Sequence, residues 1–188
     1  YSTTTTASSF DAWKKAATLK VPTVEIESYP TEPGFIRASI DLVKQGLAEA
    51  GDARVLFSAH GLPEKVIKRG DPYQRQVEQT AAAIAEHLGG VDWSVCYQSR
   101  VGPLKWIGPS TESEIRRAAA DGRNIVLYPL SFVSEHSETL VELDIEYRHL
   151  AETAGVARYV RVPAVGTHPQ FIHGLANLVQ AALWSTKS

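Results

Sequence analysis

The sequence predicts an α/β fold in which a mostly parallel sheet carries helices on both faces. Short apolar runs of strand length alternate with longer segments of helical periodicity. Strands separated by helices need crossover connections, which favour a parallel sheet covered on both sides. Chemically versatile residues follow several of the predicted strands, and ligands bind α/β sheets at that edge.

The predicted elements follow in chain order. Compact apolar runs predict strands at residues 21–26, 54–59, 93–97, 124–129 and 158–162. Helical spacing of apolar residues and helix-start signals predict helices at residues 33–50, 72–88, 111–122, 137–153 and 169–183.

Two helix starts have specific signals. Asp71 before Pro72 predicts an N-cap with proline at the first helical position, and Gly89-Gly90 predicts the end of that helix. Thr111 and Glu114 have the spacing of a capping box.

Composition excludes several classes of protein. The chain has 188 residues, enough for one α/β domain or a domain with an appended piece. Its net charge of -2 is against non-specific nucleic-acid binding, which needs a basic face. A single cysteine, Cys96, cannot form an internal disulfide or a multi-cysteine metal site.

The cellular location is also predicted from patterns. No apolar run reaches the length of a membrane span, and residues 1–9 lack the pattern of a signal peptide. We therefore expect a cytoplasmic protein, with peripheral contact at the inner face of the membrane left open. The chain starts at Tyr1 and contains no methionine, so we expect it to begin inside a longer product; a processed terminus is the alternative.

The first candidate site residue is His60. It follows an apolar strand and precedes Gly61 and Pro63, which permit and stiffen a tight turn. A histidine held this way can act as a general base or a metal ligand. It can equally be a loop histidine that bonds nearby backbone.

The second candidate is an acidic ladder. Glu138, Glu142 and Glu146 recur every four residues, which places them on one stripe of an α-helix. Successive carboxylates would lie about 6 Å apart along the axis. Such a stripe suits a divalent cation, although a solvated helix face explains it as well.

The third candidate is the loop at residues 97–109. It contains Ser99, Arg100 and Trp106 together with two glycines and two prolines. Aromatic and basic side chains together can hold a flat, anionic ligand by stacking and by charge. The other interpretation is a structured surface loop with Trp106 packed into the core.

Five sequence blocks, in this order and spacing, resemble a known family. The blocks are YSTTTTASS at residue 1, SAHGLP at residue 58, RGDPY at residue 69, QSRVGP at residue 98 and FVSEHSETLVELDIEY at residue 132. Together they are similar to the ferrochelatases. Several long motifs in register are more specific than any single short pattern.

The resemblance implies roles for the candidate residues. It implies that His60 and Glu138 face each other across a porphyrin cleft as the catalytic and metal-binding pair. Glu142 and Glu146 would relay protons or guide iron as further metal-binding residues, and His136 would orient the segment. Substrate-binding residues would be Trp106, Phe132, Ser99 and Arg100.

The resemblance also implies an activity and its partners. We expect insertion of Fe²⁺ into a porphyrin, with protoporphyrin IX favoured, in the last step of heme biosynthesis. The alternatives are a chelatase for another metal or tetrapyrrole and an inactive ligand-binding fragment. Porphyrin and ferrous iron are then the partners, and no tightly bound cofactor is expected.

Three departures from the family pattern matter. Glu135, before His136, stands where the family usually has aspartate, which keeps the charge. Some ferrochelatases hold an iron–sulfur cluster through a cysteine near the first block, where this chain has Thr3, and through a cysteine-containing tail. We therefore expect no cluster. Ferrochelatases also have two similar halves, so we expect residues 1–50 to be a remnant of the N-terminal half plus a connecting helix. Residues 51–188 would be the C-terminal α/β domain with the metal-insertion residues.

Overall fold

A four-stranded, all-parallel sheet lies at the centre of the molecule, as predicted. The computed structural model describes residues 1–18 and 21–185. The strand order is β2-β1-β3-β4. The strands are β1 (Ala53–His60), β2 (Trp93–Gln98), β3 (Asn124–Pro129) and β4 (Tyr159–Arg161).

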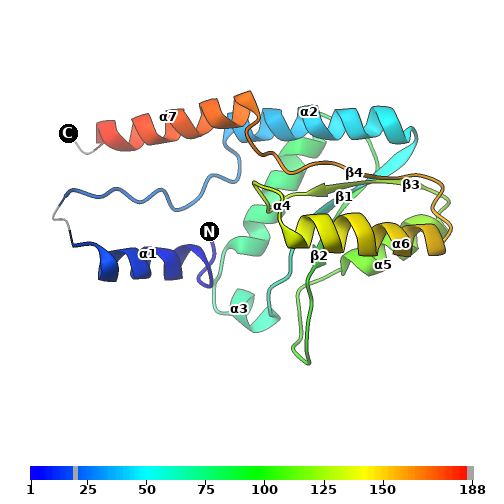
Figure 1. The fold of residues 1–188 in the computed structure, drawn as a ribbon, viewed down its shortest axis with the longest axis horizontal. Helices are drawn as coiled ribbons and strands as arrows, with labels where there is room; N and C mark the ends of the chain where they lie inside the picture. Colours follow the sequence, from blue (N-terminus) through cyan, green and yellow to red (C-terminus); the bar gives the residue numbers. More distant parts are fainter. Residues whose placement is uncertain (19–20, 186–188) are drawn as a thin grey trace.

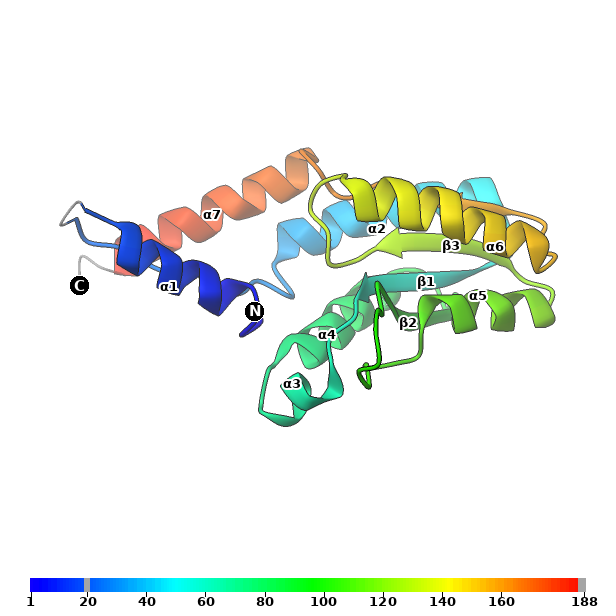
Figure 2. The same cartoon turned by 60° about the horizontal axis from the view of Figure 1, so that its bottom comes forward.

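Helices surround this sheet in both views of the molecule (Figures 1 and 2). They are α1 (Thr6–Ala16), α2 (Pro33–Ala50), α3 (Glu64–Lys68), α4 (Tyr73–Ala85), α5 (Thr111–Ala120), the π-helix η1 (Glu138–Glu146), α6 (Tyr147–Thr153) and α7 (Pro169–Ser185).

Alternation along the strands divides the core into two layers. Phe57 and Tyr128 point to the layer formed with α2 and α4, whereas Leu56 and Leu127 point to the layer formed with α5, η1 and α6. All four side chains are fully buried. Each contributes about 1.5–3 kcal/mol by leaving water, so the two layers fix the sheet between its helices.

The ends of the chain lie to one side of the sheet. In both views α1 and α7 extend beyond it (Figures 1 and 2). The first turns of α7 pack on α2 because Gly34 and Gly174 allow a close approach; a Cβ on Gly174 would meet the Glu32 carboxylate. Phe35 and Phe171 also stack there, with ring centroids 5.6 Å apart. No helix among the described residues combines the length and apolar character needed to span a membrane.

One predicted strand is wrong. Residues 21–26 form no strand and join α1 to α2 without regular structure. Val21 and Val24 are exposed, whereas Ile26 lines a cavity. The segment pairs with no strand of the sheet, and Ile26 contacts that cavity instead.

Two predicted helix starts are shifted by one residue. The cap of α5 is Ser110, whose Oγ accepts a hydrogen bond from the Ser113 amide, so Thr111 and Glu114 are not a capping box. Thr111 instead lies 3.0 Å from the Ser58 hydroxyl. Pro72 is the cap position of α4, and Asp71 accepts from the Tyr73 amide.

The predicted α-helix at residues 137–153 is a different structure in its first half. Residues Glu138–Glu146 form a π-helix, and only Tyr147–Thr153 is α-helical. A π-helix is wider because each N–H bonds the carbonyl five residues earlier. Apolar periodicity does not distinguish the two forms, and π-segments are frequent at functional sites.

Candidate functional site

A cavity of about 550 Å³ lies beyond the carboxyl ends of β1 and β2. The loop after β2 forms one side and η1 forms another. The lining residues are His60, Ser99, Val101, Trp106, Ser137, Glu138, Val141, Glu142 and Glu146. Three distant segments of the sequence therefore meet at the carboxyl-terminal edge of the sheet, where ligands bind α/β folds.

His60 and Glu138 form the centre of this site. His60 Nδ1 lies 3.0 Å from Glu138 Oε2. The two side chains are 40% and 41% exposed, respectively. The pair is open to solvent from the cavity. A half-exposed imidazole beside a carboxylate can accept a proton and bind a metal ion.

The position of His60 depends on its neighbours. The Tyr73 hydroxyl lies 3.0 Å from both the His60 carbonyl oxygen and the Ser131 hydroxyl. Gly61 is needed for close approach: a Cβ there would lie 2.9 Å from the Gln98 oxygen and 3.3 Å from the Trp106 ring. Gly61 does not have positive φ, so the conformational argument from the sequence does not apply to it.

His136 holds the start of η1. Its Nδ1 accepts a hydrogen bond from the Glu138 amide at 3.2 Å. Its backbone amide donates to the Thr139 hydroxyl at 2.9 Å, and the ring packs on Phe132 with centroids 4.8 Å apart. His136 therefore sets the direction in which Glu138 leaves the backbone, while Phe132 supports His136 and does not line the cavity.

Glu142 is the most extensively bonded carboxylate of the ladder. It accepts hydrogen bonds from the Ser99 backbone amide at 2.8 Å, the Ser99 hydroxyl at 2.6 Å, the Gln98 side-chain Nε2 at 3.2 Å and the Tyr147 hydroxyl at 2.8 Å. Ser99 has a φ of 58°, a left-handed conformation that is unusual for serine. Glu142 thus holds the loop after β2 in its turn.

The three glutamates of the ladder line the same cavity, but they differ in their hydrogen-bond partners. Glu138 bonds His60, Glu142 bonds the loop, and Glu146 is exposed in the same cavity. Among the residues that the structure describes, no three His, Cys, Asp or Glu side chains are grouped as a metal site. The candidate metal residues therefore share a wall without forming a ready-made cage.

Trp106 and Arg100 lie in the loop after β2 with different exposure. Trp106 is half-buried, lines the site and lies beside Pro63 in an isolated β-bridge. Its buried Nε1 has no hydrogen-bond partner among the described residues. Arg100 is exposed and lines a neighbouring cavity of about 410 Å³ that shares Ser99 and Glu142 with the first.

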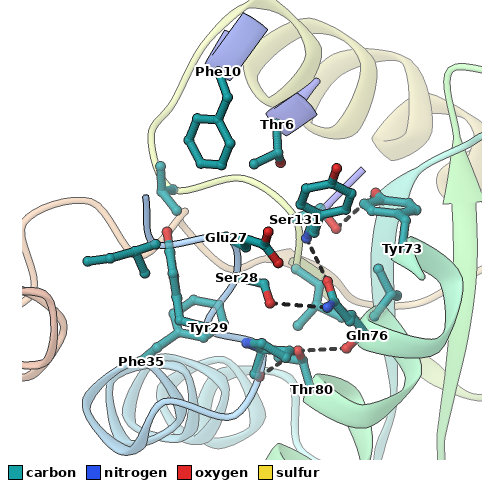
Figure 3. Close-up of a pocket in the computed structure, with 16 residues that line it drawn as sticks. Thr6, Phe10, Glu27, Ser28, Tyr29, Phe35, Tyr73, Gln76, Thr80 and Ser131 are labelled. Atoms are coloured by element: carbon teal, nitrogen blue, oxygen red, sulfur yellow. Dashed lines mark hydrogen bonds between the residues drawn. The ribbon is translucent and has the colours of Figure 1, made fainter. Parts of the chain in front are cut away.

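A further cavity of about 370 Å³ lies under α1 (Figure 3). Phe10 and Thr6 of α1 lie on one side of it, and Gln76 and Thr80 of α4 on the other (Figure 3). Its lining contains no histidine. Tyr73 connects this cavity to the site, because its side chain lines the cavity and its hydroxyl donates a hydrogen bond to the His60 carbonyl oxygen. Burial raises the pKa of Tyr73 to about 12.

The sequence analysis missed three site residues. Tyr73 positions His60, whereas Gln98 and Tyr147 both donate hydrogen bonds to Glu142. All three occur within the motifs that were recognised, but tyrosine and glutamine are common in surface loops and helices. Only the fold shows which of their polar atoms turn toward the site.

The sequence model of the ferrochelatase family matches residues 1–183. The chain belongs to the ferrochelatase family. Among curated ferrochelatases, that of Caulobacter vibrioides strain NA1000 is 56% identical over 184 residues, covering 96% of this chain and 53% of its own length. That of Phenylobacterium zucineum is 50% identical over 187 residues, covering 97% of this chain and 54% of its own.

The family assignment confirms the resemblance seen in the five sequence blocks. The chain spans about half the length of the curated ferrochelatases that it matches. A solved structure, SirB from Bacillus subtilis with Fe3+, has a TM-score of 0.53 at 18% identity. The alignment covers 78% of this chain and 54% of that one, and it supports the fold class.

Proposed function

We propose that the protein is a ferrochelatase that inserts Fe²⁺ into a porphyrin, with protoporphyrin IX as the favoured substrate, in the last step of heme biosynthesis. The observation that carries this proposal is the His60–Glu138 pair, 3.0 Å apart and open to a cavity lined by two further glutamates. Family membership supports it.

The chemistry of the pair suits the reaction. A porphyrin must lose two N–H protons before a metal ion can occupy its centre. The His60 imidazole can accept such a proton, and Glu138 is its hydrogen-bonded partner. Ferrous iron accepts both imidazole and carboxylate ligands. The same pair can therefore remove protons and receive the incoming metal ion.

The rest of the ladder receives different roles in the proposal. Glu146 is exposed and suits a first contact with hydrated iron. Glu142 also faces the cavity, but four hydrogen bonds occupy its oxygens, so binding iron there requires it to release Ser99. We propose that iron passes from Glu146 toward Glu138, with Glu142 as the intermediate ligand.

The aromatic and basic residues are proposed to hold the macrocycle. Trp106 presents its ring beside His60, and Ser99 lines the same cavity. Arg100 is exposed in the same loop, where it can pair with a carboxylate of the substrate. Phe132 packs on His136 and so supports the macrocycle site only indirectly.

The predicted domain division and cellular location are also part of this proposal. Residues 1–50 would be a remnant of the N-terminal half plus a connecting helix, and residues 51–188 the C-terminal α/β domain. The start of the sheet at Ala53 supports the boundary, although α2 shares the core of the sheet. We propose a cytoplasmic protein with peripheral contact at the inner face of the membrane. The exposed Val101 and Leu104 beside the cavity support that contact.

We also propose that the enzyme works without a tightly bound cofactor or an iron–sulfur cluster. Thr3, at the position where cluster-containing relatives have cysteine, donates hydrogen bonds to Asp71 from its amide and its hydroxyl, each 2.7 Å long. The residue therefore has a structural role that does not need a cluster.

The test is an anaerobic metal-insertion assay on the protein in its full natural length. Fe²⁺, Co²⁺ and Zn²⁺ are compared on protoporphyrin IX, coproporphyrin III and sirohydrochlorin. We expect Fe²⁺ insertion into a porphyrin, loss of at least about a hundredfold with His60→Ala, and no change with His87→Ala. His87 is an exposed histidine after α4 and serves as the matched control.

Other outcomes decide against this function. Preference for sirohydrochlorin or for another metal would identify a different chelatase. Full insertion by the His60→Ala variant would exclude the proposed base. A Soret titration with no saturable porphyrin binding would favour an inactive ligand-binding fragment.

A further inference from the structure

A buried arginine on β4 connects the two segments that carry the acidic ladder. Arg161 lies 2.6 Å from Glu135 and 3.1 Å from Asp144, through different nitrogens of its guanidinium. Its side chain is only 10% exposed. Glu135 precedes His136 at the entry to η1, and Asp144 lies within η1 between Glu142 and Glu146.

The two acids that bind Arg161 each bind a second group as well. Glu135 also accepts a hydrogen bond from the Ala164 amide at 2.8 Å, and Asp144 also pairs with Arg148 at 2.7 Å. Burial alone would raise the pKa of Glu135, but hydrogen bonds from Thr139, Ala164 and Arg161 outweigh burial and lower it. Glu135 therefore binds Arg161 as a charged carboxylate.

The apolar packing of η1 is too sparse to fix its orientation. Only Thr139 and Leu143 of its nine residues are buried. Polar contacts from β4 supply the remainder, since Tyr159 donates to the Leu143 carbonyl oxygen at 2.6 Å and Arg161 binds Asp144. A π-helix held by few apolar contacts needs such fixed points to keep its carboxylates in place.

We infer that Arg161 is a positioning residue for metal insertion: it fixes the entry and the middle of η1 at once and so holds Glu138 against His60. The inference rests on the proposed function. It assigns Arg161 no contact with the substrate, because Arg161 does not line the cavity. Its planar guanidinium binds two carboxylates in a fixed geometry that a lysine does not reproduce.

The chain supplies a matched control for this test. Arg54 is also buried, with 7% of its side chain exposed, and it also binds two carboxylates, Asp92 at 2.7 Å and Asp121 at 2.8 Å. It lies at the start of β1, whereas His60 ends that strand. Loss of either arginine removes one partner from each of two acids, but of these two arginines only Arg161 binds the segments around η1.

The experiment compares Arg161→Gln, Arg161→Lys and Arg54→Gln in the protein at its full natural length. Hydrogen exchange of residues 134–146, thermal stability, kcat and KM are measured for each. We expect Arg161→Gln to speed exchange in that segment and to lower kcat about tenfold to a hundredfold, with KM for porphyrin within about twofold. Arg161→Lys should recover part of kcat.

The control separates positioning from general destabilisation. Arg54→Gln should lose a similar amount of thermal stability, but exchange at residues 134–146 and kcat should stay near wild type. Equal losses of kcat in the two glutamine variants, or unchanged exchange in Arg161→Gln, would overturn the inference. If the wild-type protein inserts no metal, the proposed function fails, while the exchange comparison still decides whether Arg161 fixes η1. A variant that does not fold is replaced by Glu135→Gln, for which the same exchange result is expected.

Discussion

His60 Nδ1 and Glu138 Oε2 lie 3.0 Å apart although 78 residues separate them in the chain. One residue ends β1, and the other begins η1 after β3. The parallel pairing of β1 with β3 places both strand ends at the same edge of the sheet. The contact is therefore a consequence of topology, and its chemistry depends on how firmly each partner is held.

Glu138→Gln should nearly abolish metal insertion and leave the fold intact. Glutamine keeps the size and one acceptor oxygen, but it removes the charge and the capacity to exchange protons. We expect kcat to fall by about 10²–10⁴. The free energy of unfolding should change by less than about 1 kcal/mol, because the pair is about 40% exposed and screened by water. Insertion kinetics and urea unfolding measure the two effects.

The control is Glu86→Gln, at an exposed carboxylate just after α4. It should match wild type in both assays. Equal activity of Glu138→Gln and wild type would remove Glu138 from the mechanism.

Gly61→Ala should disturb the site by crowding. The added Cβ would lie 2.9 Å from the Gln98 oxygen, and backbone atoms do not move away without cost. We expect a loss of about 1–3 kcal/mol in the free energy of unfolding, as for other overpacked positions. A crystal structure of the variant should show the loop of residues 99–105 displaced from His60. A variant with unchanged stability and loop position would show that this contact relaxes freely.

Much of the fold could be predicted from the sequence, because strong local signals agree with the final packing. The run at residues 54–59 is fully buried as β1, and its apolar core of Val55, Leu56 and Phe57 is typical of a parallel strand covered on both faces. The segment at 21–26 is equally long, but it pairs with no strand of the sheet. Short apolar runs become strands only when a partner strand exists.

The individual residues of the site could be predicted from the sequence, but the hydrogen bonds between them could not. His60 and the glutamates follow strand ends, and that position could be found from the sequence alone. The π-form of η1 could not be, because the spacing of Glu138 and Glu142 fits an α-helix equally well. Nor could the hydrogen bonds of Glu142 with Ser99, which depend on the left-handed turn of Ser99.

Glu142→Ala should release the loop after β2. The substitution leaves the Ser99 amide, the Ser99 hydroxyl and the Tyr147 hydroxyl without their acceptor. We expect faster hydrogen exchange at residues 99–105 and a loss of about 1–3 kcal/mol in stability. Glu146→Ala, at an exposed carboxylate of the same ladder, should leave both quantities unchanged. Equal exchange in the two variants would show that Glu142 does not hold the loop.

Asp71 should make the attachment of the N-terminal segment dependent on pH. Its carboxylate is 5% exposed, and it accepts hydrogen bonds from Ser2, from Thr3 and from the Tyr73 amide. Burial would raise the pKa of Asp71, but these hydrogen bonds outweigh burial and lower it below its ordinary value of 3.8. A lowered pKa in the folded state means that the charged carboxylate stabilises the fold above the ordinary value. That stability is lost as the pH falls through the lowered pKa.

Asp71→Asn should remove this pH dependence together with part of the stability. Asparagine keeps one acceptor oxygen but introduces two N–H donors among groups that already donate, which costs about 1–3 kcal/mol at pH 7. Urea unfolding at pH 7 and at steps below pH 4 should therefore show a large difference from wild type at pH 7 that narrows in acid. Asp52→Asn, at a carboxylate that is 81% exposed, should follow the wild-type curve. A constant gap between Asp71→Asn and wild type at every pH would mean that the charge of Asp71 does not stabilise the attachment.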